Sequence, residues 1–219
     1  MAAIIGWDIG GAHLKAARVE GGIVVAACTV PCPLWQGMGA LDAAFAAAQA
    51  IVGAADRHAA TMTGELCDAF PGREAGVAAL AARAAREFAG RELRFYAAGS
   101  GFVAAEAAPE HAARIASANW HAAATLAAGR HADALLVDMG STTTDLIPLV
   151  GGAVAARGDS DATRAEHGEL LYTGLVRTFV MALAARAPFR GRWAPLMNEY
   201  FASAADVHRI LGQHPEGAD

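Results

Sequence analysis

The chain has 219 residues, of which 55% are hydrophobic and 18% charged, with a formal net charge of −5. This length is sufficient to bury a real core, and the composition excludes a disordered chain. The charges form no basic stripe, so neither nucleic acid nor an anionic membrane is expected as a partner. The longest uncharged stretch, 23–41, contains Pro31 and Pro33, which argues against a membrane-spanning helix.

The start of the chain and the cysteines indicate the compartment. The N-terminus enters an apolar strand without a basic segment, so we predict no signal peptide and a cytoplasmic location. Cys28, Cys32 and Cys67 are odd in number and lack a pairing framework, and no second pair accompanies Cys28 and Cys32 as zinc would require. Buried thiols in a reducing compartment are therefore expected.

Hydrophobic periodicity predicts an α/β first half that begins with a three-stranded meander. Strands are expected at 3–7, 14–19 and 23–30, with Glu20-Gly21-Gly22 as the tight turn between the last two. Further along, the pattern predicts helices at 41–55, 75–88 and 109–128 and strands at 60–63 and 93–98. This order of elements is that of a ribonuclease-H-like fold.

An internal repeat is the strongest signal in the sequence. At Ala134 an apolar strand again runs into Asp-x-Gly, followed by a polar turn, a second strand and a Gly-Gly pair. The aspartates of the two copies are Asp8 and Asp138. We therefore predict a duplicated ribonuclease-H-like, actin-like ATPase fold, with halves at 1–130 and 131–219 that face each other across a cleft.

The second half is harder to interpret after its hairpin. Residues 180–184 and 193–197 fit either the strands of a hairpin or the ends of helices. Residues 199–211 predict a helix that buries one apolar side. Less sequence follows the second meander than the first, so the second half is expected to be incomplete. The predicted buried residues of this last helix are Tyr200, Phe201, Val207, Ile210 and Leu211.

The two Asp-x-Gly turns suit phosphate chemistry. Glycine lets the backbone turn sharply and brings its N–H groups close to a ligand, and Gly10, Gly11 and Gly140 stand at these positions. Asp8 and Asp138 end matching strands, where their carboxylates can hold Mg²⁺ directly or through water. The simplest ligand is a metal-bound diphosphate. Hydroxyl donors in the second turn are Ser141, Thr142 and Thr143.

Two basic residues flank the first turn and have two readings each. Lys15, the single lysine of the chain, can reach a phosphate as a point charge or simply cover the surface. His13 can donate to a phosphate or be a solvated turn residue, and it ranks below the glycines as a ligand.

Two further stretches carry polar residues able to meet a substrate. Glu65 and Asp68 follow a short strand and suit a base or a metal-side ligand, although acids in the first turn of a helix look the same. The stretch 164–177 is equally compatible with an ordinary charged helix. Its candidate substrate-binding residues are Tyr172, Thr173, Gly174 and Arg177.

Several motifs together resemble one known family. They are DIGGAHLKAA, TGELCDAF, SANWHAAA, LLVDMGSTTTDLIP, GELLYTGLVRT and NEYFASAADVHRILG. The chain resembles the hydantoinase/oxoprolinase-like family, in a group linked to tetrahydromethanopterin-dependent C1 transfer and similar to the ether synthase of methanofuran biosynthesis. The resemblance runs over nearly the whole chain, and the fourth and fifth motifs are its specific parts.

The resemblance implies a reaction as well as a fold. A furan-methyl diphosphate loses pyrophosphate and is captured by the phenol of a glutamyl-tyramine, which forms an ether. On this reading the diphosphate is held by the two glycine turns with Lys15, and Asp8 and Asp138 organise the metal. Glu65, Asp68, Tyr172 and Arg177 are left for the phenolic substrate or its deprotonation.

Two alternatives stay open at the level of sequence. Family members continue past the last residue of this chain, and the later glycine-rich sequence that closes the adenosine side in ATP-using relatives is not present here. ATP binding is therefore not expected. The first alternative is an ATP-dependent hydrolase or kinase of the same superfamily, and the second is a non-enzymatic, nucleotide-dependent actin-like module. The sequence also leaves a homo-oligomer open.

Overall fold

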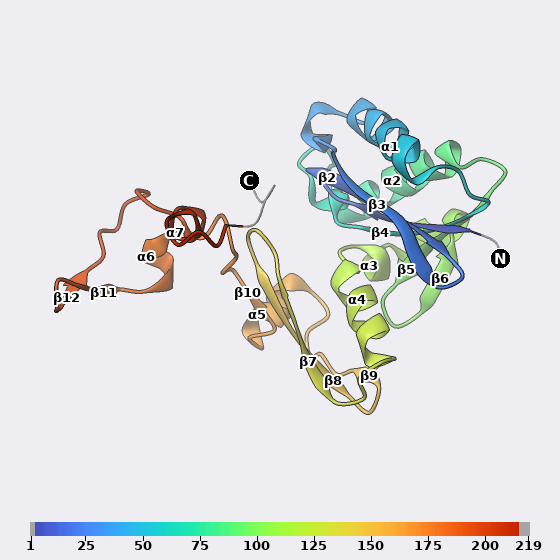
Figure 1. The fold of residues 1–219 in the computed structure, drawn as a ribbon. Helices are drawn as coiled ribbons and strands as arrows, with labels where there is room; N and C mark the ends of the chain where they lie inside the picture. Colours follow the sequence, from blue (N-terminus) through green and yellow to red (C-terminus); the bar gives the residue numbers. More distant parts are fainter. Residues whose placement is uncertain (1–2, 215–219) are drawn as a thin grey trace. The chain divides into compact units, whose positions relative to one another are not determined.

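The computed structural model describes residues 3–214, which form two compact units that divide between Ala123 and Ala124 (Figure 1). We call residues 3–123 unit 1 and residues 124–214 unit 2. The sequence placed the boundary between 130 and 131, at the end of the helix in which the units divide. Each unit contains one of the two predicted hairpins.

Unit 1 is a six-stranded mixed sheet with the order β3-β2-β1-β4-β5-β6. β1 runs parallel to β4 and β4 parallel to β5, whereas the other pairs are antiparallel. This confirms the predicted ribonuclease-H-like order, with one additional strand, β6, that the sequence did not reveal. The elements are β1 Ile4–Ile9, β2 His13–Glu20, β3 Ile23–Pro31, η1 Leu34–Gln36, α1 Gly39–Val52, β4 Arg57–Met62, η2 Gly64–Leu66, α2 Arg73–Glu87, β5 Glu92–Ala97 and β6 Gly101–Ala104.

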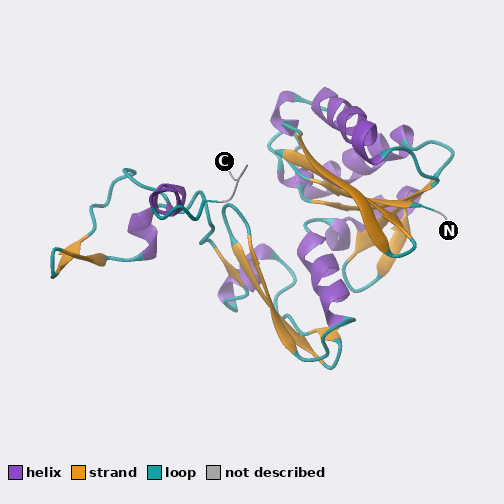
Figure 2. Ribbon diagram, viewed as in Figure 1, coloured by secondary structure: helices purple, strands orange, loops and turns teal. Residues whose placement is uncertain are grey.

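The core of unit 1 lies between one face of this sheet and helices α1 and α2 (Figure 2). Alternate residues of β1, namely Ile5, Trp7 and Ile9, are at most 3% exposed because the strand period of two points all three towards the helices. The ring of Trp7 packs 5.3 Å from Phe45 and 5.2 Å from Phe88. Each fully buried side chain such as Ile5 stabilises the fold by about 1.5–3 kcal/mol.

A buried histidine completes this core. The Trp7 indole N–H donates to His58 Nδ1 at 3.0 Å, and His58 Nε2 lies 3.0 Å from the Ala55 carbonyl oxygen. Nδ1 must accept and Nε2 must donate, so the ring is the neutral Nε2–H tautomer. The ring also stacks 4.0 Å from Phe88. Burial lowers the pKa of His58, and this effect outweighs the opposing effect of the hydrogen bond that His58 donates to the Ala55 carbonyl oxygen.

The state of His58 predicts how stability depends on pH. The pKa of His58 is lower in the folded protein than its usual value of 6.5, so below that value the unfolded chain binds the extra proton. The stabilisation by neutral His58 is complete above about pH 6.5 and is lost as the pH falls towards the lowered pKa. Urea unfolding at a series of pH values should show this loss, and His58→Asn should reduce it. His111→Asn is the control, and an equal effect of both changes would contradict the prediction.

The prediction of one long helix at 109–128 is wrong. The structure has η3 Ala105–His111, α3 Ala112–Ile115 and α4 Asn119–Ala128, with a break between the last two. Ala116 forms a parallel bridge to Met62 at the end of β4, and Ser117 has φ 51°, in the left-handed region that a helix cannot contain. The alanine-rich composition masked this break, because alanine favours a helix on both sides of it.

Unit 2 repeats the hairpin of unit 1 in a smaller sheet of order β10-β8-β7, with β9 paired to β8. Gly21 and Gly22 have φ 58° and 83°, and Gly151 and Gly152 have φ 59° and 79°, so both hairpins close with the same turn. This confirms the internal repeat. The elements are β7 Ala134–Met139, β8 Thr144–Val150, β9 Ala153–Val154, α5 Asp161–Glu166, β10 Leu170–Leu171, α6 Val180–Leu183, β11 Arg186–Phe189, β12 Arg192–Pro195 and α7 Ala204–Ile210.

The last part of unit 2 differs from the prediction. Residues 180–183 are helical and β11 pairs with β12 in a hairpin, which resolves the two readings of this stretch. The final helix starts only at Ala204, because a capping box between Ser203 and Asp206 fixes its first turn. The predicted apolar side is wrong, since Ala204 and Ala205 are its buried residues. The predicted residues Tyr200, Phe201, Val207, Ile210 and Leu211 are 39–85% exposed.

The structure also bears on the expected burial of the cysteines and on the length of the apolar helices. Of the three free cysteines, only Cys32 is buried, and burial raises the pKa of its thiol to about 11. Cys28 and Cys67 are half-buried, because they lie at the edges of the unit 1 core. Across residues 3–214, no helix is both long and apolar enough to span a bilayer.

Candidate functional site

The first Asp-x-Gly turn is held tightly at the end of β1. The Gly10 N–H donates to the His13 carbonyl oxygen at 3.0 Å, and a Cβ on Gly10 would lie 2.6 Å from that oxygen, so only glycine fits. Asp8 stands opposite Lys15 in the strand register, and its Oδ2 lies 3.2 Å from Lys15 Nζ. The Thr61 hydroxyl donates to Asp8 Oδ1 at 3.0 Å. The carboxylate is therefore oriented by two partners.

The segment that follows β4 packs directly against this turn. The Thr63 N–H donates to the Ile9 carbonyl oxygen at 3.0 Å, and a Cβ on Gly11 would lie 4.0 Å from Gly64 Cα. Gly64 is buried, and a Cβ on it would meet Leu34 Cδ1 at 2.7 Å. The carboxyl ends of the parallel strands β1 and β4 thus form one compact edge, which is where ligands bind in open α/β sheets.

The two acids after β4 have different surroundings. The side chain of Glu65 is fully buried, and its Oε1 accepts a hydrogen bond from the Ser117 hydroxyl at 2.8 Å. Burial raises the pKa of Glu65, which outweighs the hydrogen bond from Ser117. Asp68, by contrast, is exposed. Asp68 can meet a solvated substrate in the present conformation, whereas Glu65 faces the protein interior.

The second turn repeats the geometry of the first with different side chains. The Gly140 N–H donates to the Thr143 carbonyl oxygen at 2.8 Å, which matches the hydrogen bond in the first turn. Asp138 stands opposite Asp145, at the register position that Lys15 occupies in unit 1. The first turn therefore pairs an acid with a base, and the second pairs two acids. The exposed residues of this turn include Asp138, Gly140, Ser141 and Thr142.

A second predicted group lies against this turn. The Leu175 N–H donates to the Gly140 carbonyl oxygen at 3.0 Å, and the Arg177 N–H donates to that of Ser141 at 2.9 Å. The Gly174 N–H donates to the Thr178 hydroxyl at 2.6 Å. The structure thus brings together two groups of candidate residues that are separate in the sequence. The other two members are Tyr172, which is 67% exposed, and Thr173, whose carbonyl oxygen accepts from Thr144.

Gly174 leaves no room for a side chain, and this predicts a specific sensitivity. A Cβ at Gly174 would lie 2.5 Å from two backbone atoms of Thr142 and 2.6 Å from one of Ser141. Gly174→Ala should displace the second turn and destabilise unit 2 by about 1–3 kcal/mol, measured by urea unfolding. Gly129→Ala is the matched control, because its Cβ would make only ordinary contacts of 3.6 and 3.8 Å. Equal stability of both variants would contradict the prediction.

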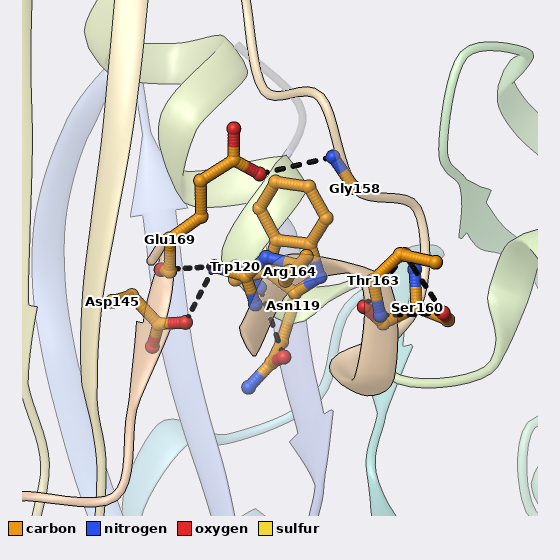
Figure 3. Close-up of polar contacts among 8 residues, drawn as sticks. All are labelled: Asn119, Trp120, Asp145, Gly158, Ser160, Thr163, Arg164 and Glu169. Atoms are coloured by element: carbon orange, nitrogen blue, oxygen red, sulfur yellow. Dashed lines mark hydrogen bonds and ion pairs between the residues drawn. The ribbon is translucent and has the colours of Figure 1, made fainter. Parts of the chain in front are cut away.

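A buried arginine is hydrogen-bonded to Asp145, the residue that stands opposite Asp138 (Figure 3). Arg164 is 1% exposed, and its Nη2 donates to Asp145 Oδ1 at 2.7 Å and to the Glu169 carbonyl oxygen at 3.2 Å. The Glu169 carboxylate in turn accepts from the N–H groups of Arg157 and Gly158, at 2.7 and 3.0 Å. Burial raises the pKa of Asp145, and Arg164 offsets this only in part.

Sequence reasoning missed the supporting residues around both turns. Thr61 could have been found, because it lies in a predicted strand beside the strand of Asp8. Asp145 is visible once the two repeats are aligned on Asp8 and Asp138, where it takes the position of Lys15. Arg164 carries no such signal, because a charged residue in a helix is usually exposed.

The donor sets around the two aspartates suit a hard cation. Within residues 3–214 no three His, Cys, Asp or Glu side chains gather into a cluster that could hold a metal by themselves. Mg²⁺ does not need one, because it usually keeps several waters and takes one or two carboxylates together with substrate phosphates. Asp8 in unit 1 and Asp138 in unit 2 each offer one such carboxylate.

Comparison with known proteins places the chain among characterised relatives. The family model for hydantoinase/oxoprolinase matches residues 56–216. The (4-{4-[2-(gamma-L-glutamylamino)ethyl]phenoxymethyl}furan-2-yl)methanamine synthase of Methanocaldococcus jannaschii is 34% identical over 97% of this chain and 63% of its own length. A protein of the same name from Methanococcus vannielii is 42% identical over 37% of this chain and 36% of its own length. The chain thus spans less than two thirds of these relatives.

Solved structures show weaker similarity. A ROK hexokinase from Thermus thermophilus has a TM-score of 0.39 and 18% identity, covering 97% of this chain and 65% of the hexokinase. An exopolyphosphatase-like protein has a TM-score of 0.34 and 16% identity, covering 70% of this chain and 48% of that protein. At these TM-scores the fold assignment rests on the strand order of unit 1.

Proposed function

Because the chain belongs to the hydantoinase/oxoprolinase family, we propose that it acts in the formation of the aryl ether of a methanofuran-type cofactor. The observation that carries the proposal is the 34% identity to the archaeal synthase over 97% of the chain. The name of that relative describes an ether between a furan-methyl group and a phenol that bears a glutamylaminoethyl chain. The paired glycine turns supply the chemistry that such a reaction needs.

The proposed reaction joins an aminomethylfuran-methyl diphosphate to a glutamyl-tyramine. The phenol oxygen forms a bond to the furan methylene carbon while the bond from that carbon to the diphosphate oxygen breaks. The bonding electrons leave with pyrophosphate, and the phenol proton passes to a base. Negative charge grows on the leaving group, so catalysis depends chiefly on donors that are already oriented towards it.

Each of the two turns carries residues suited to stabilising the leaving group. The backbone N–H groups at Gly11, Ser141 and Thr142 and the ammonium of Lys15 are donors suited to phosphate oxygens. Mg²⁺ held by Asp8 or by Asp138 would neutralise the charge that develops on pyrophosphate. His13 is exposed and supplies an additional donor beside the first turn.

The remaining polar residues suit the phenolic acceptor. Asp68 is exposed and can accept a proton from a phenol, whereas Glu65 is fully buried and hydrogen-bonded to Ser117. Arg177 and Tyr172 are exposed beside the second turn and can bind the glutamyl carboxylates and stack on the phenol ring.

The direct test measures pyrophosphate release from the furan diphosphate with and without the glutamyl-tyramine acceptor. Acceptor-dependent release and formation of the ether are expected, and both should require Mg²⁺. The same assay with ATP in place of the furan diphosphate tests the hydrolase or kinase alternative. Release of ADP or phosphate, with no ether formed from verified substrates, would overturn the proposal in favour of that alternative.

A further inference from the structure

A polar cluster of two buried residues and one exposed arginine lies beside the first turn and has no role in the proposal so far. It consists of Glu65 after β4, Ser117 between α3 and α4, and Arg73, the first residue of α2. The Ser117 hydroxyl donates to Glu65 Oε1 at 2.8 Å and accepts from Arg73 Nη2 at 2.9 Å. Arg73 Nη2 also lies 3.8 Å from Glu65 Oε1. Three segments distant in sequence are thus joined at one point.

Two members of the cluster are in energetically unfavourable states. Ser117 has φ 51° and is 8% exposed, and left-handed backbone at a residue other than glycine is strained unless the surroundings enforce it. Here the parallel bridge between Ala116 and Met62 and the two hydrogen bonds of the Ser117 hydroxyl enforce it. Glu65 Oε2 is buried without a hydrogen-bond partner among the described residues. The left-handed backbone of Ser117 and the unpartnered oxygen of Glu65 both cost free energy of folding, and a cluster with a purely structural role has little reason to retain them.

The Arg73 guanidinium is hydrogen-bonded through Nη2, and its side chain is partly exposed to solvent. Its side chain is 42% exposed, and within residues 3–214 its Nε and Nη1 groups make no hydrogen bond. A guanidinium fixed through one nitrogen keeps its other N–H groups in a planar fork, which matches the oxygen spacing of phosphate. The Arg73 guanidinium also contacts Glu65, whose neighbour Gly64 packs against Gly11 of the first turn.

We propose that Arg73 is a further phosphate-binding residue of the first turn, held in position by Ser117 and Glu65. This inference rests on the proposed function, because the phosphate it binds is that of the diphosphate leaving group. Lys15 and Arg73 then supply two cations to one edge of unit 1, where Lys15 is a point charge and Arg73 a planar fork fixed through Nη2. Ser117 acts as a positioning residue through Arg73.

Calorimetric binding of inorganic pyrophosphate to the intact chain tests the assignment. Arg73→Gln should weaken binding about tenfold or more, because it removes a charge-assisted hydrogen bond. Arg73→Lys should recover only part of the affinity, since it restores the charge without the fork. Arg86→Gln is the matched control, because Arg86 is an exposed arginine in the same helix. Ser117→Ala should weaken pyrophosphate binding although Arg73 retains its charge. Circular dichroism verifies that the variant is folded, and in a folded variant a merely structural role of Arg73 would not produce this loss of affinity.

Titration with glutamate in place of pyrophosphate tests whether Arg73 binds the diphosphate or the carboxylates of the acceptor. The inference would be overturned if Arg73→Gln weakened glutamate binding but left pyrophosphate binding unchanged. Equal effects of Arg73→Gln and Arg86→Gln on pyrophosphate binding would also overturn it. So would the absence of pyrophosphate binding by the unaltered chain. Binding of pyrophosphate that depends on Arg73, in a chain that forms no ether, would support the inference while the proposed function fails.

Discussion

Replacing Arg164 by methionine is expected to lower the free energy of unfolding of unit 2 by about 3–5 kcal/mol. Arg164 is 1% exposed, and its loss leaves the half-buried carboxylate of Asp145 without this donor. The Glu169 carbonyl oxygen loses one of two donors and keeps the Leu146 N–H at 2.9 Å. Methionine fills a similar volume, so the loss reports the missing hydrogen bonds and charge. Hydrogen exchange of β7 and β8 amides measures the stability of unit 2 specifically.

Two further variants separate the ion pair from a general effect of arginine. Arg157→Met removes an exposed arginine nearby and should change stability by less than about 0.5 kcal/mol. The double change Arg164→Met with Asp145→Leu should recover part of the loss, because no uncompensated charge then stays buried. The assignment would be refuted by a loss in Arg157→Met as large as in Arg164→Met.

Asp8→Asn and Asp138→Asn should each reduce acceptor-dependent pyrophosphate release by about 100-fold or more, which is the scale on which a preoriented electrostatic contact acts in catalysis. Each amide keeps the shape of the carboxylate but cannot neutralise Mg²⁺. In Asp8→Asn the ion pair with Lys15 is also lost, whereas Asp138→Asn removes a like charge opposite Asp145. Both variants should therefore stay folded, and Asp138→Asn should not be destabilised.

The controls for these changes are exposed acids away from the two turns. Asp56 precedes β4, at the end of the sheet opposite Asp8, and Glu166 ends α5 in unit 2. Asp56→Asn and Glu166→Gln should keep turnover within a factor of about two. Full turnover in both Asp8→Asn and Asp138→Asn would show that neither carboxylate holds a catalytic metal.

The electrostatic difference between the repeats bears on which turn binds the metal. Asp8 is already paired with Lys15 and hydrogen-bonded by Thr61, whereas Asp138 faces a second carboxylate, Asp145. Arg164 is paired with Asp145, so these three side chains still carry one net negative charge, whereas Lys15 balances the charge of Asp8. A divalent cation is attracted more strongly to the group with net negative charge. We therefore expect Asp138→Asn to weaken Mg²⁺ binding more than Asp8→Asn does.

Local sequence patterns were sufficient for the elements whose chemistry is local. The two Gly-Gly turns have nearly equal φ angles, and Gly10 and Gly140 make the same hydrogen bond, because turn conformation depends on the residues within the turn. The apolar run that ends at Asp8 likewise identified the first strand. The order of strands and helices in unit 1 could be predicted on this basis as far as β5, which was sufficient for its fold class.

Burial and long-range pairing depended on the folded chain. Leu135, Val137 and Met139 in β7 repeat the pattern of Ile5, Trp7 and Ile9, yet they are 54–59% exposed while the residues of β1 are at most 3% exposed. The difference arises because α1 and α2 cover β1, and no pattern within a strand encodes what packs on it. For the same reason the contacts of Arg73, Ser117 and Glu65 were invisible in the sequence. The paired Asp-x-Gly turns are a property of local sequence, whereas the contacts of Arg164, Arg73 and Ser117 follow from tertiary packing alone.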